Sequence, residues 1–232
     1  MSDVTGQPAA GTPDGVVRAL LRLCNAAVGA LSASGAGVSL VAEDGGRGVA
    51  AASDPASERI EELQFVLGEG PCIDAFASRR PVLVPDLTDR TTNRWPAYIS
   101  AAHDEGVRAV FAFPLQVGAA RLGVLDVFRA RAGPLSGDEL RQAFAFTDLA
   151  VRTLLDAQDD AVPGSAADGF DEAIEHSAEL FQAQGMVMVQ LGVSLAEALV
   201  RIRAHTYAEN RRLNDVAHDI VARRLRFDPD DS

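Results

Sequence analysis

The arginines near the C-terminus are the side chains whose type and spacing most clearly suggest chemistry. Between residues 169 and 226 every arginine lies from position 201 onward, whereas the start of this stretch is acidic. Guanidinium groups bind phosphates and base edges, so an arginine-rich face suits a nucleic acid. A solvated helix surface explains the same spacing equally well, and the residues alone leave both interpretations open. The arginines are Arg201, Arg203, Arg211, Arg212, Arg223, Arg224 and Arg226.

Enzymatic chemistry has no comparable support in the sequence. No histidine stands beside a nucleophile and a third orienting group, and neither a nucleophile elbow nor a Walker A loop occurs. All 21 basic residues are arginine, which excludes reactions that need a lysine. Asp215, His218 and Asp219 have helical spacing and could hold a metal, but a solvated face is the stronger interpretation. We expect no catalytic residue, no metal and no resident cofactor.

A second group of residues could line a ligand pocket. Cys72 follows a Gly-Pro break at a helix start, where the helix dipole could lower its pKa; a small buried side chain is the stronger interpretation. Trp95 and Tyr98 lie in a segment that could close over a cavity, although local packing on a sheet is favoured. We expect that cavity between the sheet and residues 86–105. The candidate pocket residues are Cys72, Trp95, Tyr98, Phe111 and Phe113.

Composition limits the classes of protein to consider. The 232 residues are 47% hydrophobic and 23% charged, with a net charge of −12, which is globular and excludes a simple polycationic nucleic-acid coat. No apolar run approaches ~18 residues, and the first residues lack the pattern of a signal peptide. Two cysteines, Cys24 and Cys72, do not make a secreted disulfide scaffold. We expect a cytoplasmic protein without a membrane span.

Residues 14–158 have the alternating periodicities of an α+β domain. Apolar residues at helical spacing predict amphipathic helices, whereas two strongly apolar runs joined by Gly118-Ala119-Ala120 predict adjacent central strands. Ser136 and Glu139 form a capping box at the start of the last helix. The result is an antiparallel sheet flanked by helices. Helices are expected at 13–32, 53–67, 71–78, 96–105 and 136–157, and strands at 37–43, 47–52, 81–84, 107–117 and 121–129.

The remainder of the chain is expected to be an all-α unit. Residues 159–168 are rich in Asp, Gly, Ser and Ala and contain Pro163, which is typical of a linker. Residues 169–226 follow with three predicted helices and no strand signal. The first helix ends at Gly192, and Ser194 with Glu197 caps the second. Three short helices bury only a modest core, so we expect this unit to depend on docking or dimerisation as well.

The C-terminal unit resembles the ANTAR domain, a three-helix RNA-binding module of bacterial antiterminators. The resemblance covers residues 174–226 and rests on four short stretches. They are Ala183-Gln184-Gly185-Met186-Val187-Met188, Gly192-Val193-Ser194-Leu195-Ala196-Glu197-Ala198, Ile202-Arg203 and Leu213-Asn214-Asp215-Val216-Ala217.

Residues 14–158 resemble a GAF domain of the type that precedes ANTAR in actinobacterial proteins. The residues that match are Gly68-Glu69-Gly70-Pro71-Cys72-Ile73-Asp74-Ala75, Arg94-Trp95-Pro96, Phe113-Pro114-Leu115 and Leu122-Gly123-Val124-Leu125-Asp126. The patterns of cyclic-nucleotide-binding and bilin-binding GAF domains are missing, because the chain has no lysine and Cys72 is followed by Ile73. No ligand is therefore inferred, and an unknown small molecule stays open.

The resemblance implies an RNA-binding regulator of transcription antitermination, in which a GAF sensor gates an ANTAR domain. ANTAR pairs bind a transcript that folds into two stem-loops, and joining two domains raises the effective concentration at the second loop. By resemblance, the RNA-binding residues are Gln184, Arg201, Arg203, Asn210, Arg211 and Arg212. Gln184 stands where the family usually has lysine, so replacing it by lysine is expected to strengthen binding.

Two further expectations concern partners. A homodimer is expected through the apolar stripes of the first helix, 13–32, and the helix before the linker, 136–158. An upstream signalling protein is a further expected partner. The alternative function is a sensory or protein-interaction regulator whose ANTAR domain contacts protein rather than RNA, an interpretation that Gln184 and the acidic net charge keep open.

Overall fold

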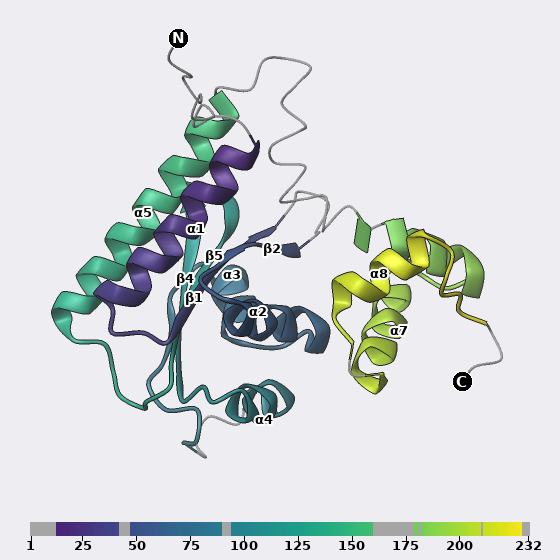
Figure 1. Cartoon of the computed structure of the whole chain (residues 1–232), viewed down its shortest axis with the longest axis horizontal. Coiled ribbons are helices and arrows are strands. Elements are labelled where there is room, and N and C mark those ends of the chain that lie inside the picture. The colour runs from purple at the N-terminus through teal and green to yellow at the C-terminus, as the bar shows by residue number, and fades with distance from the viewer. Residues whose placement is uncertain are drawn as a thin grey trace, which may run out of the picture.

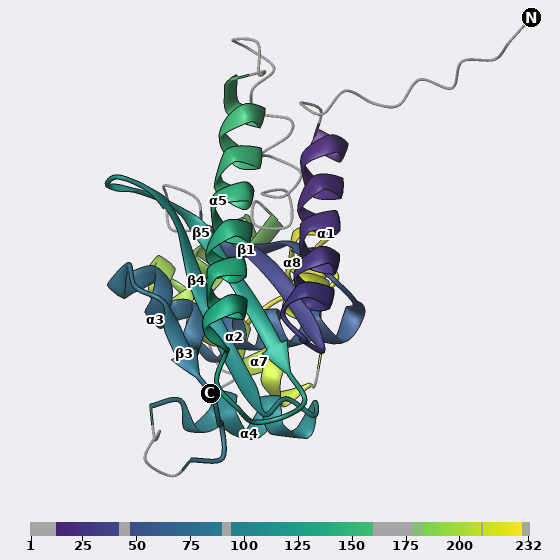
Figure 2. The ribbon, with the colours of Figure 1, turned by 90° about the vertical axis from the view of Figure 1, so that its left-hand side faces the viewer.

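A five-stranded antiparallel sheet forms the centre of the first domain (Figures 1 and 2). The computed structural model describes residues 13–41, 47–89, 94–159, 179–180, 182–209 and 211–228. The strands are β1 (Gly35–Val41), β2 (Arg47–Ala52), β3 (Val82–Val84), β4 (Ala109–Val117) and β5 (Ala120–Arg129), in the order β2-β1-β5-β4-β3. The sequence prediction of β4 and β5 as adjacent strands is confirmed, since they pair along their whole length around a tight turn at Gly118, φ 55°.

Helices cover both faces of this sheet (Figure 1). One face carries α1 (Pro13–Ala30) and α5 (Gly137–Asp159), and the other carries α2 (Pro55–Leu67), α3 (Pro71–Ser78) and α4 (Pro96–Asp104). Residues of β4 alternate between these faces: Phe111 and Phe113 pack beneath α1 and α5, whereas Val110 packs with α4. The sheet is therefore buried on both sides, which explains why the sequences of its central strands are continuous apolar runs.

The predicted capping box at α5 is present. Ser136 N donates to Glu139 Oε2 at 2.8 Å, and Glu139 N donates to Ser136 Oγ at 3.2 Å. Arg129, at the end of β5, forms an ion pair with the same glutamate and donates from Nε to Leu31 O at 3.2 Å. These contacts join the start of α5 to the sheet and to the end of α1.

The C-terminal part of the described chain is helical, as expected. Residues 182–191 form a helix, followed by α7 (Leu195–Ala208) and α8 (Leu213–Val221). Ser194 caps α7 by accepting a hydrogen bond from Glu197 N at 3.2 Å. The core of this unit contains Val187, Ile202, Val216 and Ile220. Of the linker predicted at 159–168, Asp159 belongs to α5, and the rest lies outside the described residues, as do the acids Asp171, Glu172 and Glu175.

None of the helices in the described part of the chain is long and apolar enough to cross a membrane.

Candidate functional site

Two of the predicted RNA-binding arginines lie against the first domain. Arg212 donates from Nη2 to Glu58 Oε2 on α2 at 3.2 Å, across the interface between the two units. Arg203, on α7, places its guanidinium beside the end of α2, because a Cβ added to Gly68 would lie 2.9 Å from Arg203 Nη1. The surface expected to bind phosphate is therefore partly covered by α2 in this structure.

The other two arginines have different surroundings. Arg201 is exposed on α7. Arg211 pairs with Asp219 at 2.6 Å, and Arg224 pairs with the same carboxylate at 2.7 Å. Hydrogen bonds from these two guanidiniums hold the pKa of Asp219 below its ordinary value. His218 Nδ1 lies 2.7 Å from Glu179 Oε1, so His218 and Asp219, two of the three residues considered as metal ligands, contact other side chains instead.

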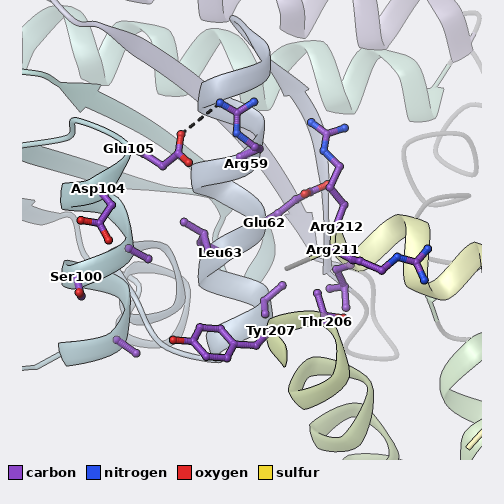
Figure 3. A pocket seen from close by; sticks show the side chains of 14 residues that line it. Arg59, Glu62, Leu63, Ser100, Asp104, Glu105, Thr206, Tyr207, Arg211 and Arg212 are labelled. Carbon is purple, nitrogen blue, oxygen red and sulfur yellow. Dashed lines mark hydrogen bonds and ion pairs between the residues drawn. The ribbon is translucent and has the colours of Figure 1, made fainter. Parts of the chain in front are cut away.

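A cleft of about 590 Å³ lies between the two units (Figure 3). Its first-domain wall consists of α2 and α4 with several acids, including Glu62, Asp104 and Glu105. Thr206, Tyr207, Arg211 and Arg212 line the opposite side. Desolvation raises the pKa of Glu62 to about 7, and the nearby Arg212 opposes this rise. Acidic and basic side chains thus face each other across the cleft.

Apolar packing continues beneath these charges. Phe65 and Val66 of α2 belong to the same buried cluster as Ile202 and Leu213 of the C-terminal unit. Burial of such side chains is the main source of stability when two helices pack. The contact between α2 and the C-terminal unit therefore has both an apolar centre and a charged rim.

Gln184, a further predicted RNA-binding residue, is buried. Gln184 is only 6% exposed, because it continues the buried stripe formed by Leu180, Ala183 and Val187. Little of the Gln184 side chain is therefore available to RNA in this structure, and a lysine there would lose hydration on entering a core position. Asn210 lies outside the described residues.

The five candidate pocket residues are not brought together. Phe111 and Phe113 point to the α1–α5 face of the sheet, because residues two apart on a strand share a face. Cys72, Trp95 and Tyr98 come from α3 and the start of α4, which pack on the other face. The predicted cavity beneath residues 86–105 is also corrected. Leu87, Trp95 and Tyr98 are buried and pack against the sheet, so side chains fill this space.

The glycine-rich break between α2 and α3 has a clear local role. Glu69 Oε1 accepts hydrogen bonds from Ala97 N at 2.8 Å and Tyr98 N at 3.1 Å, and so caps α4. Gly70 has a φ of 147° and leaves room for Gln64, whose Oε1 lies 2.5 Å from the position of a Cβ there. The same Gln64 oxygen accepts from Cys72 N at 2.7 Å and positions the start of α3.

Sequence reasoning missed a buried polar cluster on the same face of the sheet. Glu61 from α2, Cys72 from α3 and Asp126 from β5 are all buried, and their ligand atoms lie within 4.8 Å of one another. Ser39 Oγ donates to Glu61 Oε2 at 2.8 Å. Burial raises the pKa of both carboxyl groups, and the proximity of Asp126 raises that of Glu61 further. The one sequence signal for this cluster is an acidic residue, Asp126, inside an apolar strand.

Comparisons with known proteins agree with the two-part architecture. A GAF domain family model matches residues 12–155, and an ANTAR domain model matches residues 169–221. No curated protein matches the chain.

Solved structures match the first domain. A domain of a protein described as a two-component sensor histidine kinase from Sinorhizobium meliloti is 20% identical with a TM-score of 0.50, covering 61% of this chain and 91% of its own. A GAF domain region from Geobacter sulfurreducens is 20% identical with a TM-score of 0.51, covering 60% and 93%. The GAF domain of the cyanobacteriochrome TePixJ is 13% identical with a TM-score of 0.52, covering 67% and 99%.

These identities show the fold of the first domain and nothing about its ligand. The family model covers more than half of the chain, and the second model matches the helical part that follows it. The chain therefore belongs to the GAF-domain family and carries an ANTAR domain after its GAF domain.

Proposed function

We propose that this protein is an RNA-binding regulator of transcription antitermination whose GAF domain controls its ANTAR domain. The observation that carries the proposal is the contact of Arg203 and Arg212 with α2. In the docked arrangement Glu58 and the end of α2 occupy part of the surface of these guanidiniums and therefore compete with an RNA phosphate for them. In the proposed organisation, the GAF domain spans 14–158, the linker 159–168 and the ANTAR domain 169–226.

The RNA expected to bind is a tandem stem-loop, as the ANTAR resemblance implies. A gel-shift titration of the full chain at graded salt tests this directly. We expect binding to a two-loop RNA that weakens as salt rises, because arginine–phosphate contacts release counterions. A single-loop RNA should bind more weakly, since it does not benefit from the raised effective concentration at a second site. Absence of binding to either RNA at low salt would contradict the proposal.

Reversing the charge of Glu58 should strengthen RNA binding. Glu58→Arg removes the partner of Arg212 and places a like charge opposite it, which disfavours the docked arrangement. The affinity should rise roughly 2- to 5-fold, because partly exposed ion pairs contribute at most ~1 kcal/mol. The measurement is the same gel-shift titration.

Asp138→Arg is the matched control for this change. Asp138 is an exposed residue of the GAF domain that lies at the start of α5 and pairs with Arg141. The substitution changes the net charge by the same amount, away from α2. Equal affinity gains in both variants would mean that net charge alone raises the RNA affinity. That result would contradict the proposal that α2 controls the ANTAR domain.

The protein is also proposed to be a homodimer through α1 and α5. These helices pack side by side on one face of the sheet, and α5 leaves Phe144 and Leu149 exposed, with Leu149 51% exposed. Phe144 also contacts Phe113 of the sheet, whereas Leu149 has no such aromatic contact in the described residues. An exposed leucine on a helix that the sheet covers from one side suits pairing with a second copy.

Leu149→Arg should dissociate this dimer. An arginine in an apolar interface loses hydration without a partner, so the dissociation constant should rise at least about tenfold, or ~1.4 kcal/mol. Light scattering after size exclusion gives the mass. Val117→Arg is the control, because Val117 is 44% exposed but lies at the β4–β5 turn. A monomeric parent at tens of micromolar would refute the dimer.

A protein-binding role for the ANTAR domain is the second candidate. Val189, Val200 and Tyr207 of this domain are exposed, and Gln184 is buried rather than available to RNA. Exposed apolar side chains favour protein partners over phosphates. The salt-dependent titration distinguishes the two functions, because only RNA binding should weaken steeply with salt.

A further inference from the structure

The buried cluster of Glu61, Cys72 and Asp126 is assembled from three separate elements of the GAF domain. The helix α2 supplies Glu61, α3 supplies Cys72 and β5 supplies Asp126. Each side chain is at most 2% exposed. Their three ligand atoms lie within 4.8 Å of one another. We propose that these residues bind a divalent transition-metal ion, with zinc as the representative of this class.

A fourth polar group points to a ligand at the same place. Tyr98 is completely buried, and its hydroxyl has no hydrogen-bond partner in the described part of the chain. Burial raises the pKa of Tyr98 well above its ordinary value, and the charges of Asp126, Glu61 and Cys72 raise it further. An unpartnered buried hydroxyl is costly unless something satisfies it. A metal ion, or a water molecule bound to one, would do so.

Within the described residues, no cationic side chain pairs with either carboxyl group of the cluster. No ion pair in the described ranges involves Glu61 or Asp126, and the hydrogen bond from Ser39 to Glu61 comes from a neutral donor. Buried carboxylates are normally protonated, paired with a base or bound to a metal. A divalent cation compensates two carboxylates at once, which a hydroxyl cannot do.

Backbone features leave room for this cluster. Gly37 of β1 is opposite Asp126 in the sheet, and a Cβ there would lie 2.7 Å from Glu61 Oε1. Any side chain at Gly37 would displace Glu61 from the cluster. The bond from Cys72 N to Gln64 Oε1 fixes the start of α3 close by. The site thus depends on a glycine at close approach and on a positioned helix start.

The donor set selects the class of ion. A thiolate with two carboxylates suits zinc and similar borderline ions, whereas magnesium and calcium prefer oxygen ligands alone. Zinc bonds of ~2.0–2.3 Å place tetrahedral ligand atoms about 3.5 Å apart. The three ligand atoms lie within 4.8 Å of one another, so small side-chain movements would bring all three to bonding distance of one ion. Tyr98 or water would supply the fourth ligand. This proposal stands independently of RNA binding.

The experiment uses the full chain after removal of metals with a chelator. Titration calorimetry with zinc chloride should show one ion bound per chain. Cobalt(II), which takes the same ligands, should produce a near-ultraviolet charge-transfer band from the thiolate. Cys72→Ser should abolish this band, while Cys24→Ser should retain it. Cys24 is the matched control because it is also buried but belongs to α1, which packs on the opposite face of the sheet.

A carboxylate variant keeps the test valid if the cysteine variant fails to fold. Asp126→Asn removes one charged ligand and should weaken zinc binding at least about tenfold, since loss of even an outer partner has such an effect. Zinc should raise the melting temperature more at alkaline than at acidic pH, because the ligands bind deprotonated. Binding of less than one zinc ion per chain, or a cobalt band that remains in Cys72→Ser, would overturn the proposed metal site.

Discussion

Asp126→Asn should stabilise the metal-free protein near pH 8 by on the order of 3 kcal/mol, because it removes a buried charge beside Glu61. Burial raises the pKa of Asp126 to about 7 and raises that of Glu61 as well. The folded chain therefore holds protons that the unfolded chain has already released. In this state the asparagine substitutes for a carboxylate that is costly to ionise.

The pH dependence follows from the same shift. Protonated Asp126 favours the folded state relative to ionised Asp126. This contribution to the free energy of unfolding is fully present below the ordinary carboxyl pKa and is lost as the pH rises through the pKa of Asp126 in the folded state, about 7. The parent should therefore become less stable between about pH 5 and pH 8, and the variant should lose part of this dependence. Urea unfolding in the presence of a chelator measures both proteins.

Asp138→Asn serves as the control for this prediction. Asp138 is exposed at the start of α5, where its charge stays hydrated. We expect little change in the free energy of unfolding at either pH. A parent protein that gains stability from acidic to alkaline pH would contradict the prediction, as would a variant that follows the parent in parallel.

Replacing Arg201 and Arg203 together with alanine should weaken binding to tandem stem-loop RNA by about 1–3 kcal/mol for each base edge that an arginine binds, or roughly 5- to 150-fold. An arginine that binds phosphate alone should instead lower the salt slope by about one unit when it is replaced. Both arginines lie on α7, Arg201 exposed and Arg203 against Gly68. The full chain is titrated with RNA at several salt concentrations.

Replacing Arg203 also weakens the docking of the ANTAR domain on α2, which favours RNA binding, but this effect is smaller than the loss of the RNA contact. Without the interaction between Arg203 and the end of α2, the ANTAR domain would be freer to bind RNA, but a partly exposed interaction of this kind contributes at most ~1 kcal/mol. The RNA interaction is larger, so the net result is weaker binding. Arg80→Ala is the control, because it removes an exposed arginine from the GAF domain. Unchanged RNA affinity in the double variant would show that neither arginine contributes to RNA binding.

Local sequence determined the secondary structure of both domains well. The apolar runs of β4 and β5, the Gly118 turn and the Ser136–Glu139 capping box depend on neighbours a few residues apart, and all three are present. The ANTAR and GAF resemblances are similarly local, and the family matches agree with them. Short-range periodicity and capping therefore sufficed to predict the elements and their order.

Tertiary structure alone decided where those elements place their side chains. Phe111 and Phe113 point to the α1–α5 face of the sheet, whereas Trp95 and Tyr98 pack on the opposite face with α4. The helix stripe that contains Gln184 is covered by packing. Periodicity shows which residues share one face of a helix or strand, but not which element packs against that face.

The most informative contacts join segments that are distant in the chain. Glu61, Cys72 and Asp126 meet only because α2, α3 and β5 pack on one side of the sheet. Arg212 reaches Glu58 only because α2 docks on the ANTAR domain. The sequence alone shows the charges of these residues. Their proximity, and with it their pKa shifts and partners, depends on long-range packing that no local pattern encodes.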